Sequence, residues 1–217
     1  MLTGHLAIGL TAKRLEPKIS LGTWFLAALL ADLILFPLLI AGIERVAIQP
    51  GVPTNRVIGE NIAYSHSLLT DALWATLFAI AYYLYRPNRR AALLLFAAVL
   101  SHWIIDFFSH RPDMPISPGF KAAYGLGLWN SLPATLALEG GFWLLAVIIY
   151  IRATPSITRV RMVAFWIGVA LFTLAWIGNI TRSMDPNPVR AGISGLIFLS
   201  GMVAWAYWID RRPAQSS

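Results

Sequence analysis

The sequence has no cysteine and little charge. The absence of cysteine excludes disulfides and thiolate metal ligands, and it leaves the redox compartment open. Only 12% of the 217 residues are charged, whereas 58% are hydrophobic, and the mean hydropathy is +0.65. This composition excludes an ordinary soluble globular domain and indicates a polytopic membrane protein.

Apolar runs of about 20 residues are long enough to cross a hydrocarbon core of roughly 30 Å as helices. Six such runs are present, at about 21–43, 66–86, 91–109, 133–152, 162–181 and 191–209. We therefore expect an all-α, polytopic membrane helical bundle with about six transmembrane helices. We expect a single integral membrane domain over residues 1–217. Residues 1–140 form the half that contains the metal site, and residues 141–210 form the scaffold helices.

The net charge of +7 does not indicate nucleic-acid binding, because the basic residues stand at the ends of the apolar runs. Those on one side of the expected membrane are Lys13, Arg14, Lys18, Arg86, Arg89, Arg90, Arg152, Arg159, Arg161, Arg211 and Arg212. The opposite side carries Arg45, Arg56, Arg111, Lys121, Arg182 and Arg190. The positive-inside rule then predicts that both the N- and C-termini are cytoplasmic.

Ionisable residues inside apolar spans are costly, so each is a functional hypothesis. The chain has few, and they are His66, Asp71, His102, Asp106, His110 and Glu139 near the outer ends of their spans, with Asp32 at mid-depth. Because separate spans place these groups in the outer half of the membrane, we expect one shared site there.

His5 lies on the cytoplasmic side by this topology, yet it can reach the same site. The segment TGHLAIGLTAKRL begins with Thr3 as a potential cap and ends with Lys13 and Arg14 at the inner interface. Nine helical residues rise roughly 13 Å, which brings His5 close to the depth of Asp32. We predict a short N-terminal half-helix whose end is buried among the other spans.

The segment SHWIIDFFSHRPD places His102, Asp106 and His110 four residues apart, on one face of a helix. Imidazole nitrogens and carboxylate oxygens together suit zinc, and also manganese or iron. We interpret these residues, with His5, Asp32 and His66, as ligands of one or two divalent metal ions, most simply zinc. A metal in such a site lowers the pKa of a bound water molecule and produces a nucleophile.

Each residue also has a structural interpretation. His102 and Asp106 can form a hydrogen-bonded pair, and Asp71 and Glu139 can brace helix ends. The remaining histidines can serve as a loop residue (His110), a helix-end contact (His66) or an N-terminal polar contact (His5).

Four segments carry a resemblance to a known family: GHLAIG at 4–9, LLADLIL at 29–35, YSHSLL at 64–69 and SHWIIDFFSH at 101–110. In order and spacing they resemble the predicted inner-membrane metal-dependent hydrolases, which include the LexA-binding inner-membrane proteins. The resemblance implies a location in the bacterial inner (plasma) membrane. It also implies metal-site roles for His5, Asp32, His66, His102 and Asp106.

The chain departs from that family at two positions. The family usually has two carboxylates in the first span, where 31–34 here keeps only Asp32, and an additional histidine where Asn61 stands. The order His, Asp, His, HxxxD, His is more distantly similar to the zinc-dependent phospholipase C and P1 nuclease superfamily. That similarity implies a bridging or general-base role for Asp32, and Glu139 is the one carboxylate comparable with the superfamily's final HxxxE.

The function that we predict is a membrane-embedded, metal-dependent hydrolase acting on an ester or phosphoester of a lipid-like substrate. Asp32 would steer a metal-activated water, with Glu139 and Asp71 as further catalytic residues. Arg111 and Lys121 would attract a phosphate head group. Two alternatives stay open: an ion- or proton-coupled transporter, and a non-catalytic scaffold with a structural metal.

Overall fold

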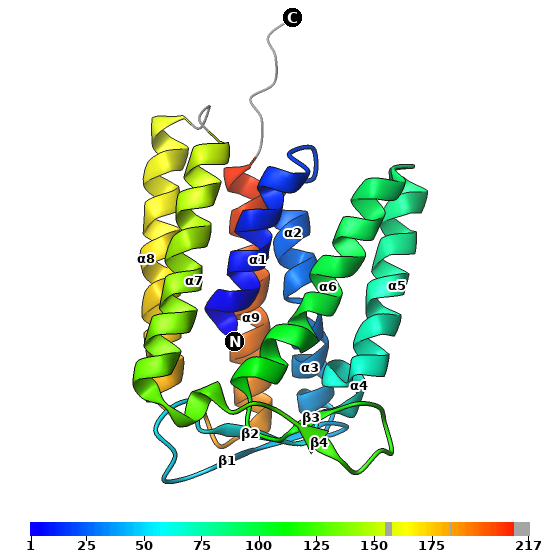
Figure 1. The fold of residues 1–217 in the computed structure, drawn as a ribbon, viewed down its shortest axis with the longest axis vertical. Helices are drawn as coiled ribbons and strands as arrows, with labels where there is room; N and C mark the ends of the chain where they lie inside the picture. The colour runs from blue at the N-terminus through cyan, green and yellow to red at the C-terminus, as the bar shows by residue number, and fades with distance from the viewer. Residues whose placement is uncertain (155–157, 183, 211–217) are drawn as a thin grey trace, which may run out of the picture.

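The chain folds into the helical bundle that the composition predicts. The computed structural model describes residues 1–154, 158–182 and 184–210 (Figure 1), so Arg211 and Arg212 of the basic-residue comparison lie outside the described residues. The chain is 71% helical with little strand, which confirms the all-α prediction. Among the described residues, five helices are long and apolar enough to cross a membrane, and there are six spans if a bent pair of helices is counted as one, as expected of an integral membrane protein.

The helices follow the predicted runs closely, with a few irregular pieces between them. In chain order they are α1 (Leu2–Leu15), α2 (Leu21–Ala28), α3 (Leu30–Ile40), α4 (Ala63–His66), α5 (Leu68–Tyr85), α6 (Arg89–Ser109), the 3₁₀ helix η1 (Leu128–Asn130), α7 (Leu132–Ala153), α8 (Arg159–Thr181) and α9 (Pro188–Ile209). Side chains of Ser67, Asn88, Ser131 and Asn187 accept hydrogen bonds from the first backbone N–H groups of α5, α6, α7 and α9. These capping residues fix where the long helices begin.

Helix α1 confirms the predicted half-helix, but Thr3 is not its cap, because the helix already begins at Leu2. It begins at mid-height of the bundle and runs to the end at which α9 also ends (Figure 1). Leu6 and Leu10 are fully buried in a core that includes Phe25, Tyr150 and Phe165. Gly9 permits this packing, because a Cβ there would lie 2.6 Å from Cδ1 of Phe25. The short helix is thus packed mainly against α7, α2 and α6.

The first predicted span, 21–43, is not straight. Helices α2 and α3 meet at an angle of 55°, and the break lies at Leu29, whose φ and ψ are −103° and 7°. This conformation interrupts the regular helix and ends α2 at Ala28. Asp32 therefore stands in the first turn of α3, directly after the bend.

Two short antiparallel strand pairs close one end of the bundle (Figure 1). Strand β1 (Arg45–Ile48) pairs with β2 (Val57–Asn61), and β3 (Met114–Pro115) pairs with β4 (Ala123–Tyr124). The sequence analysis predicted no strand there.

The opposite end of the bundle is fastened by a buried ion pair. Lys13 Nζ lies 2.6 Å from Asp210 Oδ2 and also donates to the carbonyls of Pro17 and Ile19. Asp210 Oδ2 accepts in addition from the Leu21 backbone N–H at 2.9 Å. The end of α9 is thereby joined to α1 and to the start of α2.

Candidate metal centre

Six side chains from four separate parts of the chain meet inside the bundle, in the half that ends in the strands. They come from α1 (His5), α3 (Asp32), the end of α4 (His66) and the second half of α6 with its cap (His102, Asp106 and His110). These are the six residues that the sequence analysis proposed as metal ligands.

Asp106 lies at one centre of this cluster. Its Oδ1 is 3.2 Å from His5 Nε2, and its Oδ2 is 3.3 Å from His102 Nε2 and 3.6 Å from His110 Nε2. His102 and His110 approach it from the preceding and following turns of α6, as the four-residue spacing predicts. The carboxylate is almost completely buried.

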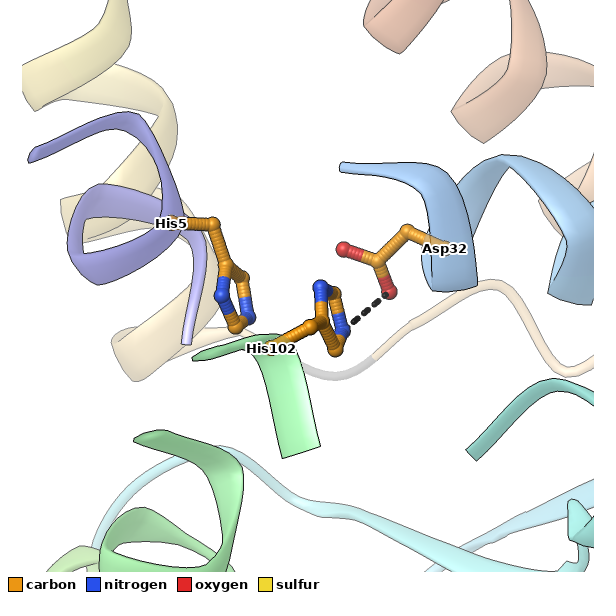
Figure 2. Close-up of side chains that lie close together, drawn as sticks. All are labelled: His5, Asp32 and His102. Atoms are coloured by element: carbon orange, nitrogen blue, oxygen red, sulfur yellow. Dashed lines mark ion pairs between the residues drawn. The ribbon is translucent and has the colours of Figure 1, made fainter. Parts of the chain in front are cut away.

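Asp32 lies at the other centre. Its Oδ1 is 3.4 Å from His66 Nε2 and 3.9 Å from His102 Nε2. Figure 2 shows Asp32 pointing towards His102, whose ring lies against that of His5. The two rings are stacked with centroids 3.7 Å apart. His102 and His66 bring their Nε2 atoms within 3.3 Å of each other, so the two carboxylates share one group of imidazoles.

The bend in the first span orients His102. Nδ1 of His102 donates a hydrogen bond to the Ala28 carbonyl at 2.9 Å, and Ala28 is the last residue of α2. With Nδ1 as the donor to this carbonyl, a neutral His102 would present the lone pair of Nε2 to the cluster. A ligand histidine is commonly fixed in this way by an acceptor behind it.

His66 is oriented by a carboxylate that the sequence analysis did not identify. Glu44 is buried, and it accepts hydrogen bonds from the backbone N–H groups of Tyr64 and Ser65 and from Ser65 Oγ at 2.6 Å. Since the Ser65 hydroxyl proton goes to Glu44, its oxygen accepts from His66 Nδ1 at 2.7 Å. His66 Nε2 therefore faces Asp32, and in a neutral ring it would carry the lone pair.

His110 has the same arrangement at the end of α6. Its Nδ1 donates to Asp113 Oδ1 at 2.9 Å, and Asp113 Oδ2 accepts from the Gly59 backbone N–H on β2 at 2.8 Å. Three histidines of the cluster thus have Nδ1 engaged and Nε2 turned inward.

His5 differs from the other three histidines. It is 1% exposed, and within the part of the chain that the structure describes its Nδ1 has no hydrogen-bond partner. The amino group of Met1 lies 3.1 Å from His5 Nε2 and 2.7 Å from Asp106 Oδ1. This side of the cluster accordingly faces a positively charged group.

The donors fit a divalent metal. One ligand atom from each of His66, His102 and Asp106 lies within 4.8 Å of the others, and the same is true of His5, Asp32 and His102. Buried imidazole nitrogens with carboxylate oxygens form the donor set that zinc prefers. Two neighbouring three-residue groups that share His102 are compatible with one or two ions.

The two other predicted catalytic carboxylates lie outside these groups. Glu139 is fully buried and accepts hydrogen bonds from Trp129 Nε1 and Trp176 Nε1, each at 2.7 Å. Asp71 is also fully buried, and within the described residues neither of its oxygens has a hydrogen-bond partner. The contacts of Glu139 are those of a brace between two indoles, and a catalytic role for either residue stays a prediction.

Arg111 does not have the role in phosphate attraction that the sequence suggested. It is 6% exposed, and its guanidinium donates to Asn130 Oδ1 and to the carbonyls of Asn55, Thr54 and Trp129. Burial lowers the pKa of this guanidinium, and the charge of Asp113 opposes that shift. Arg111 holds the β1–β2 loop against η1, so its charge is engaged by the protein itself.

A cavity of about 600 Å³ opens beside the cluster. Its polar end is lined by Asp32, His66, Asp106 and His110, and its remaining wall includes side chains of α3, α8, α9 and the strand end. Asp32 retains 23% side-chain exposure, far more than the 2% of Asp106. Asp32 is thus the cluster carboxylate most accessible from the cavity.

The comparisons with known proteins add no assignment. No protein-family model, curated protein or solved structure matches this chain. The interpretation of the site therefore depends on its own geometry and chemistry.

Proposed function

We propose that this protein is a membrane-embedded, metal-dependent hydrolase that cleaves an ester or phosphoester of a lipid-like substrate. The observation that supports it most is the convergence of four imidazoles and two carboxylates, three of the imidazoles with Nδ1 held by an acceptor. The resemblance of four segments to the predicted inner-membrane metal-dependent hydrolases supports the same activity and a bacterial inner-membrane location.

In this proposal His5, His66, His102, Asp106 and His110 hold the metal, together with Asp32. When bound, a divalent ion, most simply zinc, would supply Lewis-acid activation of a water molecule at near-neutral pH. Asp32 lines the cavity and is partly exposed, so it is placed to orient that water and accept its proton. The water oxygen forms the new bond to carbon or phosphorus, and the ester alcohol leaves with a proton.

The test compares the purified, zinc-loaded protein with the variants Asp32→Asn and Glu60→Gln. Glu60 is an exposed carboxylate on β2 and serves as the matched control. We expect hydrolysis of phospholipids or soluble phosphoesters, a loss of roughly a hundredfold or more in D32N, and no change in E60Q. Equal rates in the wild type and D32N, or no hydrolysis by the metal-loaded protein, would contradict the proposal.

A further inference from the structure

The cavity beside the metal centre has chemically distinct parts. Beyond the polar end, its wall includes apolar side chains of α3, α9 and the strand end: Leu35, Phe36, Val46, Ile62, Phe198 and Leu199. Small residues of α8 and α9 also line it, namely Ala175, Gly178, Ala191, Ser194 and Gly195. A volume of about 600 Å³ is within the range of small-molecule sites, roughly 300–1,000 Å³.

In the part of the chain that the structure describes, the lining of the cavity includes a cation that is available for a ligand. Arg182, the residue that ends α8, lines the cavity and is exposed, and among the described residues no ion pair or side-chain hydrogen bond involves it. The neighbouring acid, Asp185, is already neutralised by Arg190, with Nε 3.0 Å from Oδ2 and a second contact of 3.2 Å. Arg190 therefore neutralises the negative charge that Asp185 places near Arg182.

The helices that form this wall also face lipid. On α8, Leu174 and Ile177 are exposed on the outer surface, and on α9 Ile193 and Ile197 are exposed in the same way. A molecule already in the membrane thus meets the same two helices that line the cavity. Apolar side chains, the metal-binding groups and the Arg182 cation therefore surround the same cavity.

We infer that this cavity binds an anionic amphiphile, with its hydrocarbon chain against Phe36, Phe198 and Leu199 and its negatively charged head group at Arg182. This inference deepens the proposed function, because it names the substrate class of the same site. An apolar wall accepts the chain by hydrophobic burial, and the guanidinium forms charge-assisted hydrogen bonds to a phosphate or carboxylate.

Photo-crosslinking tests the inference without depending on turnover. The probe is an alkyl phosphate that carries a diazirine on its chain, and a phosphocholine of the same chain is the zwitterionic comparison. We expect the alkyl phosphate to label α3, α8 or α9 at cavity residues, as located by peptide mass spectrometry. Arg182→Gln should weaken this labelling roughly tenfold, whereas Arg45→Gln, at an exposed cation of β1 outside the cavity lining, should change it by no more than about twofold.

A second variant fills the space instead of removing the charge. Ser194 lines the cavity, and within the described residues its hydroxyl bonds only to its own helix, at the Ala191 carbonyl (3.1 Å). Ser194→Phe should abolish cavity labelling while the bound metal stays unchanged. Ile197→Phe, on the lipid-facing side of the same helix, is the control and should label as the wild type does.

The outcomes separate this inference from the proposed hydrolase. Cavity labelling that is reduced in R182Q and S194F supports the amphiphile site. If no ester is cleaved in that case, only the hydrolase proposal is contradicted. Labelling that is unchanged in both variants, or that is stronger with the phosphocholine, contradicts the amphiphile site. If soluble phosphoesters are hydrolysed in that case, the hydrolase proposal is still supported.

Discussion

At the scale of single residues, the site depends on the groups behind the histidines as much as on the histidines. Glu44 acts on His66 through Ser65, Ala28 acts on His102 through a backbone carbonyl, and Asp113 acts on His110. Each of these acceptors fixes a protonated Nδ1 and leaves Nε2 free to bind a metal.

Glu44 offers the cleanest test of this orientation. Glu44→Gln retains the size of the side chain but weakens its hold on the Ser65 hydroxyl, so His66 loses its fixed tautomer. We expect metal affinity to fall on the order of tenfold, with helicity unchanged, as measured by competition with a chelator and by circular dichroism. Glu60→Gln removes an exposed carboxylate from the nearby strand and should bind metal as the wild type does.

The sequence predicted the donors but not the groups that orient them. Histidine and aspartate inside apolar runs are conspicuous, and their depth along separate spans indicated that they meet. Glu44 was not recognised, because it follows the first span in a loop and its partner Ser65 lies 21 residues away. Ala28 contributes a backbone carbonyl, which no side-chain pattern reveals.

At the scale of elements, the apolar runs predicted the helices, but the bend in the first span and the strands were not predicted. The bend lies at Leu29 within the apolar stretch ALLADLIL, whereas the only proline of this segment, Pro37, stands inside α3. Both helices pack against α9, but α2 also packs against α1 and α3 against α4, and His102 contacts the Ala28 carbonyl at the bend. The β1–β2 pair had a detectable signal, because VAI and VIGEN flank a segment rich in proline and glycine.

Arg111 joins the elements at the strand end, and its removal should destabilise them. Arg111→Ala leaves the buried carbonyl of Thr54 without this donor, and the Trp129 carbonyl keeps only the hydrogen bond from the Thr54 hydroxyl. We expect the free energy of unfolding in detergent to fall by about 2–4 kcal/mol, as measured by denaturant titration. Lys121→Ala removes an exposed cation from the same end and should change it by less than about 0.5 kcal/mol. Equal effects of the two variants would contradict the bracing role of Arg111.

At the scale of the whole molecule, the two ends of the bundle are held by different means. The end opposite the strands depends on the ion pair of Lys13 with Asp210, whose side chains are only 8% and 13% exposed. Lys13→Met leaves the Asp210 carboxylate without its cation, so we expect a loss of about 3 kcal/mol in unfolding free energy, again by denaturant titration. Lys18→Met, at an exposed position nearby, is the control and should unfold as the wild type does.

The membrane orientation is a prediction from the distribution of basic residues, and it is open to direct measurement. The chain has no cysteine, so single cysteines report position without a background. Ala122→Cys, at the strand end, should react with a membrane-impermeant maleimide in intact cells. Pro87→Cys, between α5 and α6 at the opposite end, should react only after the cells are permeabilised. The reverse pattern would invert the predicted topology.

The central claim is that the buried cluster holds a divalent metal, and metal content measures it most directly. The protein is purified without chelator, and bound metal is determined by elemental analysis for the wild type, His102→Ala, Asp106→Asn and Glu139→Gln. We predict one or two ions per chain in the wild type and a large loss of metal in His102→Ala and Asp106→Asn. E139Q alters a buried carboxylate outside the cluster, so it should bind as much metal as the wild type. A metal-free wild type, or equal metal in all four proteins, would contradict the account.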